Sequence, residues 1–168
     1  RFSSDQWVSF QQEQIDVLRA LIPDRQRITH NLMGYNFQEI DCFHLARELD
    51  FVSWDNYPIF QADAPAHIAL NHATMRGIKD APFWVMEQQA GPSGWQVMSR
   101  QPKPGQLRLW AYQGIAHGAD GIVFFRWRSC RYNTEEYWHG ILEHHGQPRR
   151  RYREVQKMGH ELARISNA

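Results

Sequence analysis

Residues 121–128 read GIVFFRWR, and this stretch decides the fold class. Four apolar residues, Ile122 to Phe125, follow Gly121 without a polar interruption. Successive side chains of a strand point to opposite faces, so a strand that is apolar throughout is buried on both faces. Parallel sheets bury both faces, whereas antiparallel sheets commonly expose one. The stretch therefore predicts a strand inside a parallel sheet.

The alternation of strand and helix patterns continues along the chain from this strand. Further strands are predicted at residues 27–34, 50–58 and 82–88. Helices are predicted at about 5–22, 36–49, 66–76 and 105–117, and in a last segment that carries Tyr152, Val155, Leu162 and Ile165. Gly77 is the expected end of the third helix, because glycine readily adopts the left-handed conformation of helix C-termini.

The order αβαβαβαβα predicts a parallel sheet with helices outside it. Four strands are few for a doubly wound sheet, and they are also half of a (β/α)8 barrel, a fold that takes ~250 residues. The 168 residues suit one unit, and no stretch predicts a second domain. Periodicity alone leaves the choice between the two architectures open.

Bulk composition narrows the partners and the compartment. The chain has 19 basic and 18 acidic residues, and a formal net charge of +1 suggests neither nucleic acid nor membrane as a partner. No apolar run approaches the ~20 residues that span a bilayer, and no signal peptide is visible. Cys42 and Cys130 have no CxxC or metal-ligand spacing. This argues against a disulfide scaffold and favours a reducing compartment, so we expect a cytoplasmic protein.

Polar and aromatic side chains gather at the predicted carboxyl ends of the strands, the edge at which parallel α/β folds bind ligands. These residues are His30 and Asn31, Trp54 to Tyr57, Glu87 and Gln88, and Phe125 to Arg128, with Trp95 and the pair Glu135 and Glu136 beyond them. Carboxylates beside aromatic rings are the usual composition of a carbohydrate site, although a bulky core would also explain the seven tryptophans.

Several of these residues also have a structural interpretation. Glu87 follows a buried run abruptly and is a candidate ion-pair partner of Arg126 or Arg128. Trp54 and Trp127 fit packing better than ligand binding. No metal or other cofactor is expected, because no common metal-site spacing is present in the histidines His139, His144 and His145.

Four segments carry a resemblance to a known family: LDFVSWDNYP, FWVMEQQAGPSGW, PKPGQLRLWAYQGIAHGADGIVFFRWR and YWHGILEHHGQPRRRY. They resemble the second half of the catalytic barrel of glycoside hydrolase family 42, the β-galactosidases. The resemblance covers nearly the whole chain and implies that residues 1–168 are the C-terminal half, strands 5–8, of a (β/α)8 TIM barrel. It also implies an enzyme that cleaves terminal β-galactosides with retention of configuration.

The resemblance assigns roles to five residues. Glu87, in the MEQ that closes the third predicted strand, matches the family's catalytic nucleophile. Tyr57, in WDNYP, matches the tyrosine near that nucleophile, and Trp95 matches the tryptophan that walls the galactose subsite. Phe125 matches an aromatic residue that lines the sugar. Glu135, ten residues further on, matches a glutamate that hydrogen-bonds galactose hydroxyls.

One binding position departs from the family pattern. Many members have a sugar-binding histidine three residues after the glutamate that matches Glu135. This chain has Trp138 there, followed by His139, and both are candidate substrate-binding residues. The chemistry itself requires two carboxyl groups about 5–5.5 Å apart, one acting as nucleophile and the other as acid and then base.

The family's acid/base is the glutamate of an Asn-Glu pair, and this chain contains no Asn-Glu dipeptide. Glu135 and its neighbour Glu136 match a binding position instead. We therefore interpret the chain as a fragment whose partners are a β-galactoside and the N-terminal half of the barrel. The family commonly forms trimers, so the full-length protein is expected to be a homo-oligomer, with a trimer as the first candidate. Alone, the chain is expected to be poorly active.

Three alternatives stay open on the sequence. The first is another retaining glycosidase of the same clan, such as a β-glucosidase or an enzyme acting on α-L-arabinopyranosides. The second is a fragment that binds galactosides without hydrolysing them. The third is a purely structural α/β module, which leaves the residues at the strand ends unexplained.

Overall fold

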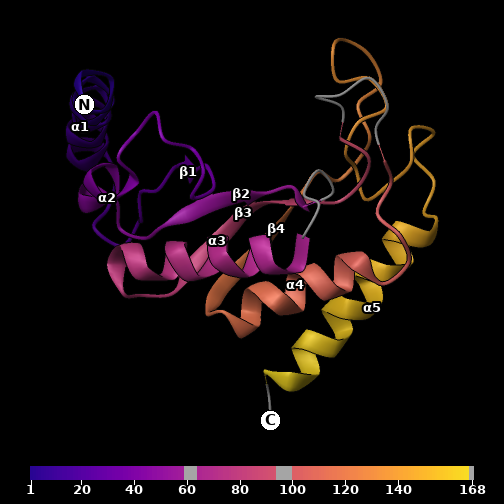
Figure 1. Cartoon of the computed structure of the whole chain (residues 1–168). Coiled ribbons are helices and arrows are strands. Elements are labelled where there is room, and N and C mark those ends of the chain that lie inside the picture. Colours follow the sequence, from indigo (N-terminus) through magenta and orange to yellow (C-terminus); the bar gives the residue numbers. More distant parts are fainter. Residues whose placement is uncertain (59–63, 94–99, 167–168) are drawn as a thin grey trace.

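Four parallel strands form one sheet in the order in which they occur in the chain (Figure 1). The structure is a computed structural model that describes residues 1–58, 64–93 and 100–166. The strands are β1 (Asn31–Leu32), β2 (Ser53–Asn56), β3 (Phe83–Gln89) and β4 (Ala119–Phe125). The helices are α1 (Phe2–Leu21), α2 (Cys42–Leu45) with the 3-10 turn η1 (Ala46–Glu48), α3 (Ala64–Lys79), α4 (Gln106–Ala116) and α5 (Arg150–Ile165). The predicted α/β class with a parallel sheet is confirmed.

The helices lie along one face of the sheet. Figure 1 shows α3 and α4 side by side beneath the strands, α5 against α4, and α1 beside α2 at the β1 end. The core lies between the helices and the strands, and Trp54 is only 3% exposed within it, which confirms its predicted packing role. Other buried members of the core are Leu32, Leu45, Val52, Met75, Phe83 and Val85.

The opposite face of the sheet is less covered. Val123, inside the apolar strand β4, is 41% exposed, although its strand pattern predicts burial on both faces. The difference has a simple cause: in the described part of the chain, the helices pack on one face and leave Val123 in contact with solvent. Among the described residues no helix is long and apolar enough to cross a membrane.

Several element boundaries differ from the predictions because side chains compete for backbone groups. The strand predicted at 27–34 shrinks to β1, since the Asp50 carboxylate accepts the backbone N–H of Ile28 at 2.5 Å. The helix predicted at 36–49 begins only at Cys42, where the Asp41 side chain accepts the N–H of His44 at 3.1 Å as an N-cap.

The helix predicted to end at Gly77 continues to Lys79. Ile78 packs against the core, and the Lys79 ammonium donates to the carbonyl of Ala46 at 2.8 Å, so the last turn is held by tertiary contacts. The left-handed conformation falls on Asp80, with φ 47°. By contrast α4 ends as predicted, before Gly118 with φ 94°.

Candidate active site

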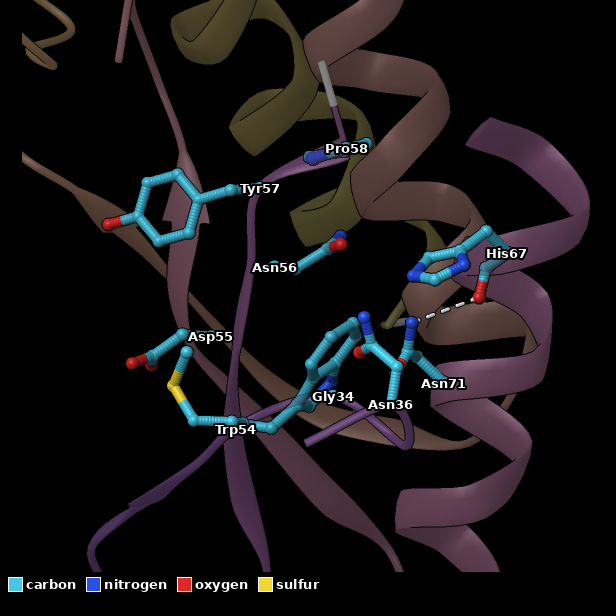
Figure 2. Close-up of a pocket in the computed structure, with 10 residues that line it drawn as sticks. Gly34, Asn36, Trp54, Asp55, Asn56, Tyr57, Pro58, His67 and Asn71 are labelled. Carbon is cyan, nitrogen blue, oxygen red and sulfur yellow. Dashed lines mark hydrogen bonds between the residues drawn. The ribbon is translucent and has the colours of Figure 1, made fainter. Parts of the chain in front are cut away.

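The carboxyl ends of β2 and β3 bring Asp55, Tyr57 and Glu87 together. Asp55 and Glu87 are paired neighbours in the parallel ladder, and Tyr57 directly follows β2. Side chains two residues apart on a strand share a face, so Tyr57 projects to the same side as Asp55. Figure 2 shows both on one side of β2, with Trp54 and Asn56 on the other side, toward α3.

Both carboxylate oxygens of Glu87 accept a hydrogen bond. The Tyr57 hydroxyl donates to Oε2 at 2.6 Å, and the Asn31 amide donates to Oε1 at 3.4 Å. The ion pair with Arg126 or Arg128 does not form; Arg126 lies instead 3.4 Å from Glu135. The 2.6 Å bond from the Tyr57 hydroxyl to the Glu87 carboxylate is charge-assisted and short, and such bonds are strong. Glu87 is therefore held by neutral donors, an arrangement that suits a carboxylate that must react.

The surroundings of the cluster raise the pKa values of Tyr57 and Asp55. Burial, followed by the hydrogen bond to Glu87, raises the pKa of the Tyr57 phenol, so Tyr57 stays protonated and donates. Burial and the charge of Glu87 raise the pKa of Asp55 to about 7, against the opposing hydrogen bond from Asn31. Asp55 is thus partly protonated near neutral pH, next to the Glu87 carboxylate.

An aromatic wall stands beside the carboxylates. The His139 ring is 1% exposed and lies edge-on to Tyr57, with 5.6 Å between ring centroids, and to Phe125 at 5.0 Å. Burial lowers the pKa of His139, so the ring is neutral near pH 7. Phe125 is the last residue of β4, and its neighbour in the ladder is Gln89 of β3. The structure therefore brings His139 and Phe125 to the same rim as Glu87.

Close backbone packing holds His139 there. Its N–H donates to the carbonyl of Pro92, and its carbonyl accepts from the Ser129 hydroxyl at 2.9 Å. A Cβ on Gly91 would lie 2.2 Å from the His139 carbonyl oxygen, so only glycine permits this approach. The loop after β3 and the loop after β4 are thereby fixed against one another.

The remaining predicted residues are placed as follows. Glu135 is partly exposed and faces Arg126, and the Trp138 ring lies edge-on to His139 with 6.1 Å between centroids. Trp95 lies outside the described residues. Trp127 is 61% exposed and lies edge-on to Tyr152 with 6.0 Å between ring centroids, so it is not part of the core.

Two strand-end predictions are wrong. His30 and Asn31 were expected to end the first strand, but Asn31 is the first residue of β1, and His30 turns toward α1 with Nε2 2.5 Å from the Gln11 amide oxygen. Gln88 lies buried away from the site, where its Oε1 accepts from Asn56 at 2.9 Å. Strand alternation explains the outcome, because Asn56 and Gln88 lie one residue out of phase with Asp55 and Glu87.

Sequence reasoning placed Asn31 and Asp55 among the residues of the rim but gave neither a role toward Glu87. Asp55 carried a usable signal: it is two residues before Tyr57 in one strand and must share its face. Asn31 carried none, because its contact with Glu87 joins residues 56 positions apart. Among the described residues there is no group of three His, Cys, Asp or Glu that could hold a metal ion.

A pocket of about 390 Å³ opens beside β2, and its lining residues include Asp55 and Tyr57 (Figure 2). Trp54 and Asn56 contribute side chains to it from β2, while His67 and Asn71 contribute from α3. Asn71 donates to the His67 carbonyl at 3.0 Å and accepts the N–H of Tyr35 at 2.7 Å, so its polar groups serve the fold. The Tyr57 side chain, which donates to Glu87, points to the opposite side of the strand from Trp54 and Asn56.

A parallel α/β sheet that carries a glutamate, a tyrosine and aromatic rings at its carboxyl rim has the composition expected of a carbohydrate site. Comparison with known proteins identifies the family. The model of glycoside hydrolase family 42, described as β-galactosidase, matches residues 1–165, and the chain belongs to this family.

Its relatives agree in sequence and in structure. The chain is 41% identical over 177 residues to the β-galactosidase BgaH of Haloferax lucentense, covering 96% of this chain and 26% of the relative. It is 36% identical over 182 residues to a β-galactosidase of Thermus thermophilus, covering 99% and 28%. The solved β-galactosidase of Bacillus circulans sp. alkalophilus superposes with a TM-score of 0.90 at 40% identity, covering 98% and 24%. The four-stranded sheet thus matches part of a family 42 TIM barrel, and the chain spans about a quarter of the length of these relatives.

Proposed function

We propose that this chain carries the nucleophile of a retaining β-galactosidase and that Glu87 is that nucleophile. The observation that carries the proposal is the 2.6 Å hydrogen bond from Tyr57 to Glu87 at the carboxyl rim of the sheet. A nucleophilic carboxylate must be ionised and aimed, and a neutral phenol donor serves both needs without neutralising the charge. Family membership and the named relatives support β-galactosides as the substrate.

The proposed reaction is the retaining mechanism that the family resemblance implies. A Glu87 oxygen attacks the anomeric carbon, the bond from that carbon to the aglycone oxygen breaks, and the aglycone oxygen takes a proton from an acid. Water then attacks the same carbon, gives its proton to the same group acting as base, and the Glu87 carboxylate leaves. Tyr57 stabilises the carboxylate before attack and again as it departs.

The sugar is proposed to lie against the aromatic wall. Phe125 and Trp95 offer ring faces to the apolar side of galactose, and Glu135, Trp138 and His139 offer polar or indole N–H groups to its hydroxyls. A neutral, buried His139 suits a hydroxyl partner, because it presents one donor and one acceptor. Trp95 enters this list on the family pattern alone.

The acid/base is proposed to lie outside residues 1–168, in the N-terminal half of the same barrel. The uncovered face at Val123 and the quarter-length match to the relatives both support this division. The isolated chain should then hydrolyse a nitrophenyl β-galactoside far more slowly than a full-length galactosidase. Equal rates would contradict the division.

A cytoplasmic homo-oligomer, with three copies as the first candidate, is proposed for the full-length protein.

Chemical rescue tests the nucleophile. In the full-length enzyme, Glu87→Gly should abolish hydrolysis of dinitrophenyl β-galactoside, and added azide should restore turnover by forming α-galactosyl azide. Glu136→Gln is the matched control, because Glu136 lies on the neighbouring loop 3.7 Å from His144 and does not contact Glu87. Formation of α-galactosyl azide by a variant of any other glutamate, or the absence of rescue in Glu87→Gly, would contradict the assignment. Rates on galactosides, glucosides, mannosides and arabinosides then establish the sugar preference.

A further inference from the structure

We propose that Asn31 and Asp55 form a positioning pair that aims the Glu87 carboxylate through Oε1, the oxygen that Tyr57 does not hold. The inference deepens the proposed function and rests on it. Neither residue belongs to the sugar-binding wall, and neither is proposed to touch the substrate. Their role is to limit the rotation of Glu87 about its last side-chain bond, so that Oε1 faces the anomeric carbon.

The contacts of one amide group support this role. Asn31 Nδ2 lies 2.7 Å from Asp55 Oδ1 and 3.4 Å from Glu87 Oε1. An asparagine amide has two N–H donors, so one group can serve two carboxyl oxygens. The short bond to Asp55 fixes the direction of the amide. The long contact to Glu87 guides Oε1 but leaves its lone pairs available for attack, whereas the 2.6 Å bond from Tyr57 engages Oε2 fully.

The backbone that carries Asn31 is anchored from three sides. Asn31 pairs with Ser53 in the ladder between β1 and β2. Its carbonyl lies 3.1 Å from Nδ1 of His30, whose Nε2 lies 2.5 Å from the Gln11 amide oxygen. Gln11 is buried in α1 and donates to the Leu45 carbonyl at 2.8 Å. A group that positions another must itself be fixed, and this chain of bonds connects Asn31 to two helices.

Charge in the cluster is consistent with a supporting role for Asp55. Glu87 faces it from β3, Asn31 faces it from β1, and Tyr57 follows it on its own strand. Burial, followed by the negative charge of Glu87, raises the pKa of Asp55 to about 7, so the two carboxyl groups are not both fully ionised near neutral pH. A protonated Asp55 still accepts from Asn31 through its carbonyl oxygen, while the negative charge stays on Glu87.

Asn31 and Asp55 lie deeper in the sheet than Tyr57. Asp55 precedes Tyr57 by two residues on a strand that rises about 3.3 Å per residue, so it lies roughly 6–7 Å deeper below the rim. Asn31 begins β1 and pairs with Ser53, which is deeper still. Glu87 pairs with Asp55 in the ladder and so starts at the same depth, and its carboxylate contacts both Asn31 and Tyr57.

The test measures kcat/KM for dinitrophenyl β-galactoside, which reports attack by the nucleophile, in the full-length enzyme. Asn31→Ala and Asp55→Ala should each lower it about 10–100-fold, the order expected when a reacting group is misplaced by about 1 Å. Inhibition by free galactose should change less than about 2-fold, because the sugar-binding wall is intact. Asp55→Asn keeps an acceptor for Asn31 and should stay within about 3-fold of the parent. The double variant Asn31→Ala with Asp55→Ala should lose no more than Asn31→Ala alone, since Asp55 acts through Asn31.

Asn36→Ala is the matched control, because Asn36 lines the pocket beside β2, on the side toward α3, and should leave kcat/KM unchanged (Figure 2). If Asn31→Ala does not fold, Asn31→Leu removes the donors at similar volume and should show the same loss. Normal kcat/KM in the Asn31 variants, additive losses in the double variant, or weakened galactose inhibition would each overturn the proposal. A failure of azide to rescue Glu87→Gly would instead contradict the proposed function itself, so the two outcomes are distinguishable.

Discussion

Replacing Tyr57 by phenylalanine removes one hydroxyl and leaves a ring of the same shape. The ring keeps its edge-on contact with His139, at 5.6 Å between centroids, so the wall of the site should stay in place. The change removes the 2.6 Å hydrogen bond to Oε2 of Glu87. Hydrogen bonds to charged groups contribute about 1.5–3 kcal/mol, which corresponds to roughly 10–150-fold in rate.

The two chemical steps should not suffer equally. During attack the Glu87 carboxylate loses negative charge, so a donor on Oε2 stabilises the starting state at least as much as the transition state. When the galactosyl-enzyme is hydrolysed, the carboxylate regains its charge, and the Tyr57 hydroxyl stabilises it as it departs. Tyr57→Phe should therefore slow the second step by about 10–100-fold and slow the first step much less.

Dinitrophenyl β-galactoside exposes this difference, because its good leaving group makes the second step limiting. Tyr57→Phe should then show a lower kcat together with a lower KM, and a burst of dinitrophenol equal to the enzyme concentration. Tyr112→Phe is the matched control, since Tyr112 donates to Glu161 at 3.2 Å on the outer helices, away from the rim. A kcat within about 2-fold of the parent, or a loss confined to kcat/KM, would refute the reasoning.

Three further predictions concern stability. Burial and the neighbouring His117 lower the pKa of His72 to about 3, whereas its unfolded value is about 6.5. The stability that neutral His72 contributes to the folded state is therefore complete above pH 6.5 and is lost as the pH falls toward 3. Urea titrations at each pH should show the free energy of unfolding falling by up to about 5 kcal/mol through His72 over this range. His72→Leu should weaken this pH dependence, and an unchanged pH dependence in the variant would contradict the prediction. Arg151 is 1% exposed, donates to the Gly140 carbonyl at 3.0 Å and pairs with Glu143 at 3.1 Å. Arg151→Met should therefore lower the free energy of unfolding by about 3–5 kcal/mol, and a loss below about 1 kcal/mol would contradict a structural role for this pair. Gly91→Ala should lower the free energy of unfolding by about 1–3 kcal/mol and raise KM, because the added Cβ displaces His139. Gly159→Ala is the control: a Cβ there meets nothing within 4 Å and should not destabilise the protein.

Periodicity was sufficient to predict the parallel sheet, because long apolar strands and amphipathic helices each bury a face whose spacing is visible in the chain. It was insufficient at element ends, where single polar side chains decide. Asp50 accepts the N–H of Ile28 and shortens β1, and Asp41 caps α2. Gly77 has the right residue type for a helix end, but Ile78 and Lys79 gain tertiary contacts that extend α3 past it.

The site was predictable where residues share one strand or one motif. Glu87 and Tyr57 were predicted on motif and strand position, and the structure brings them within 2.6 Å. The contact of Asn31 with Glu87 was not predictable, because it depends on the register of strands that no local pattern encodes. His139 reaches the rim through a left-handed backbone, with φ 58°, and through the space that Gly91 leaves. Such long-range packing is not visible in the spacing of residues.

The identity of the nucleophile is tested most directly by trapping it. The full-length enzyme would be treated with a 2-deoxy-2-fluoro-β-galactoside that carries a good leaving group, digested, and sequenced by mass spectrometry. The fluorine slows both steps, and the good leaving group lets the covalent intermediate accumulate. A single label is expected on Glu87, and none at this position in Glu87→Gln. A label on Glu135, on Glu136 or on a residue outside this chain would contradict it.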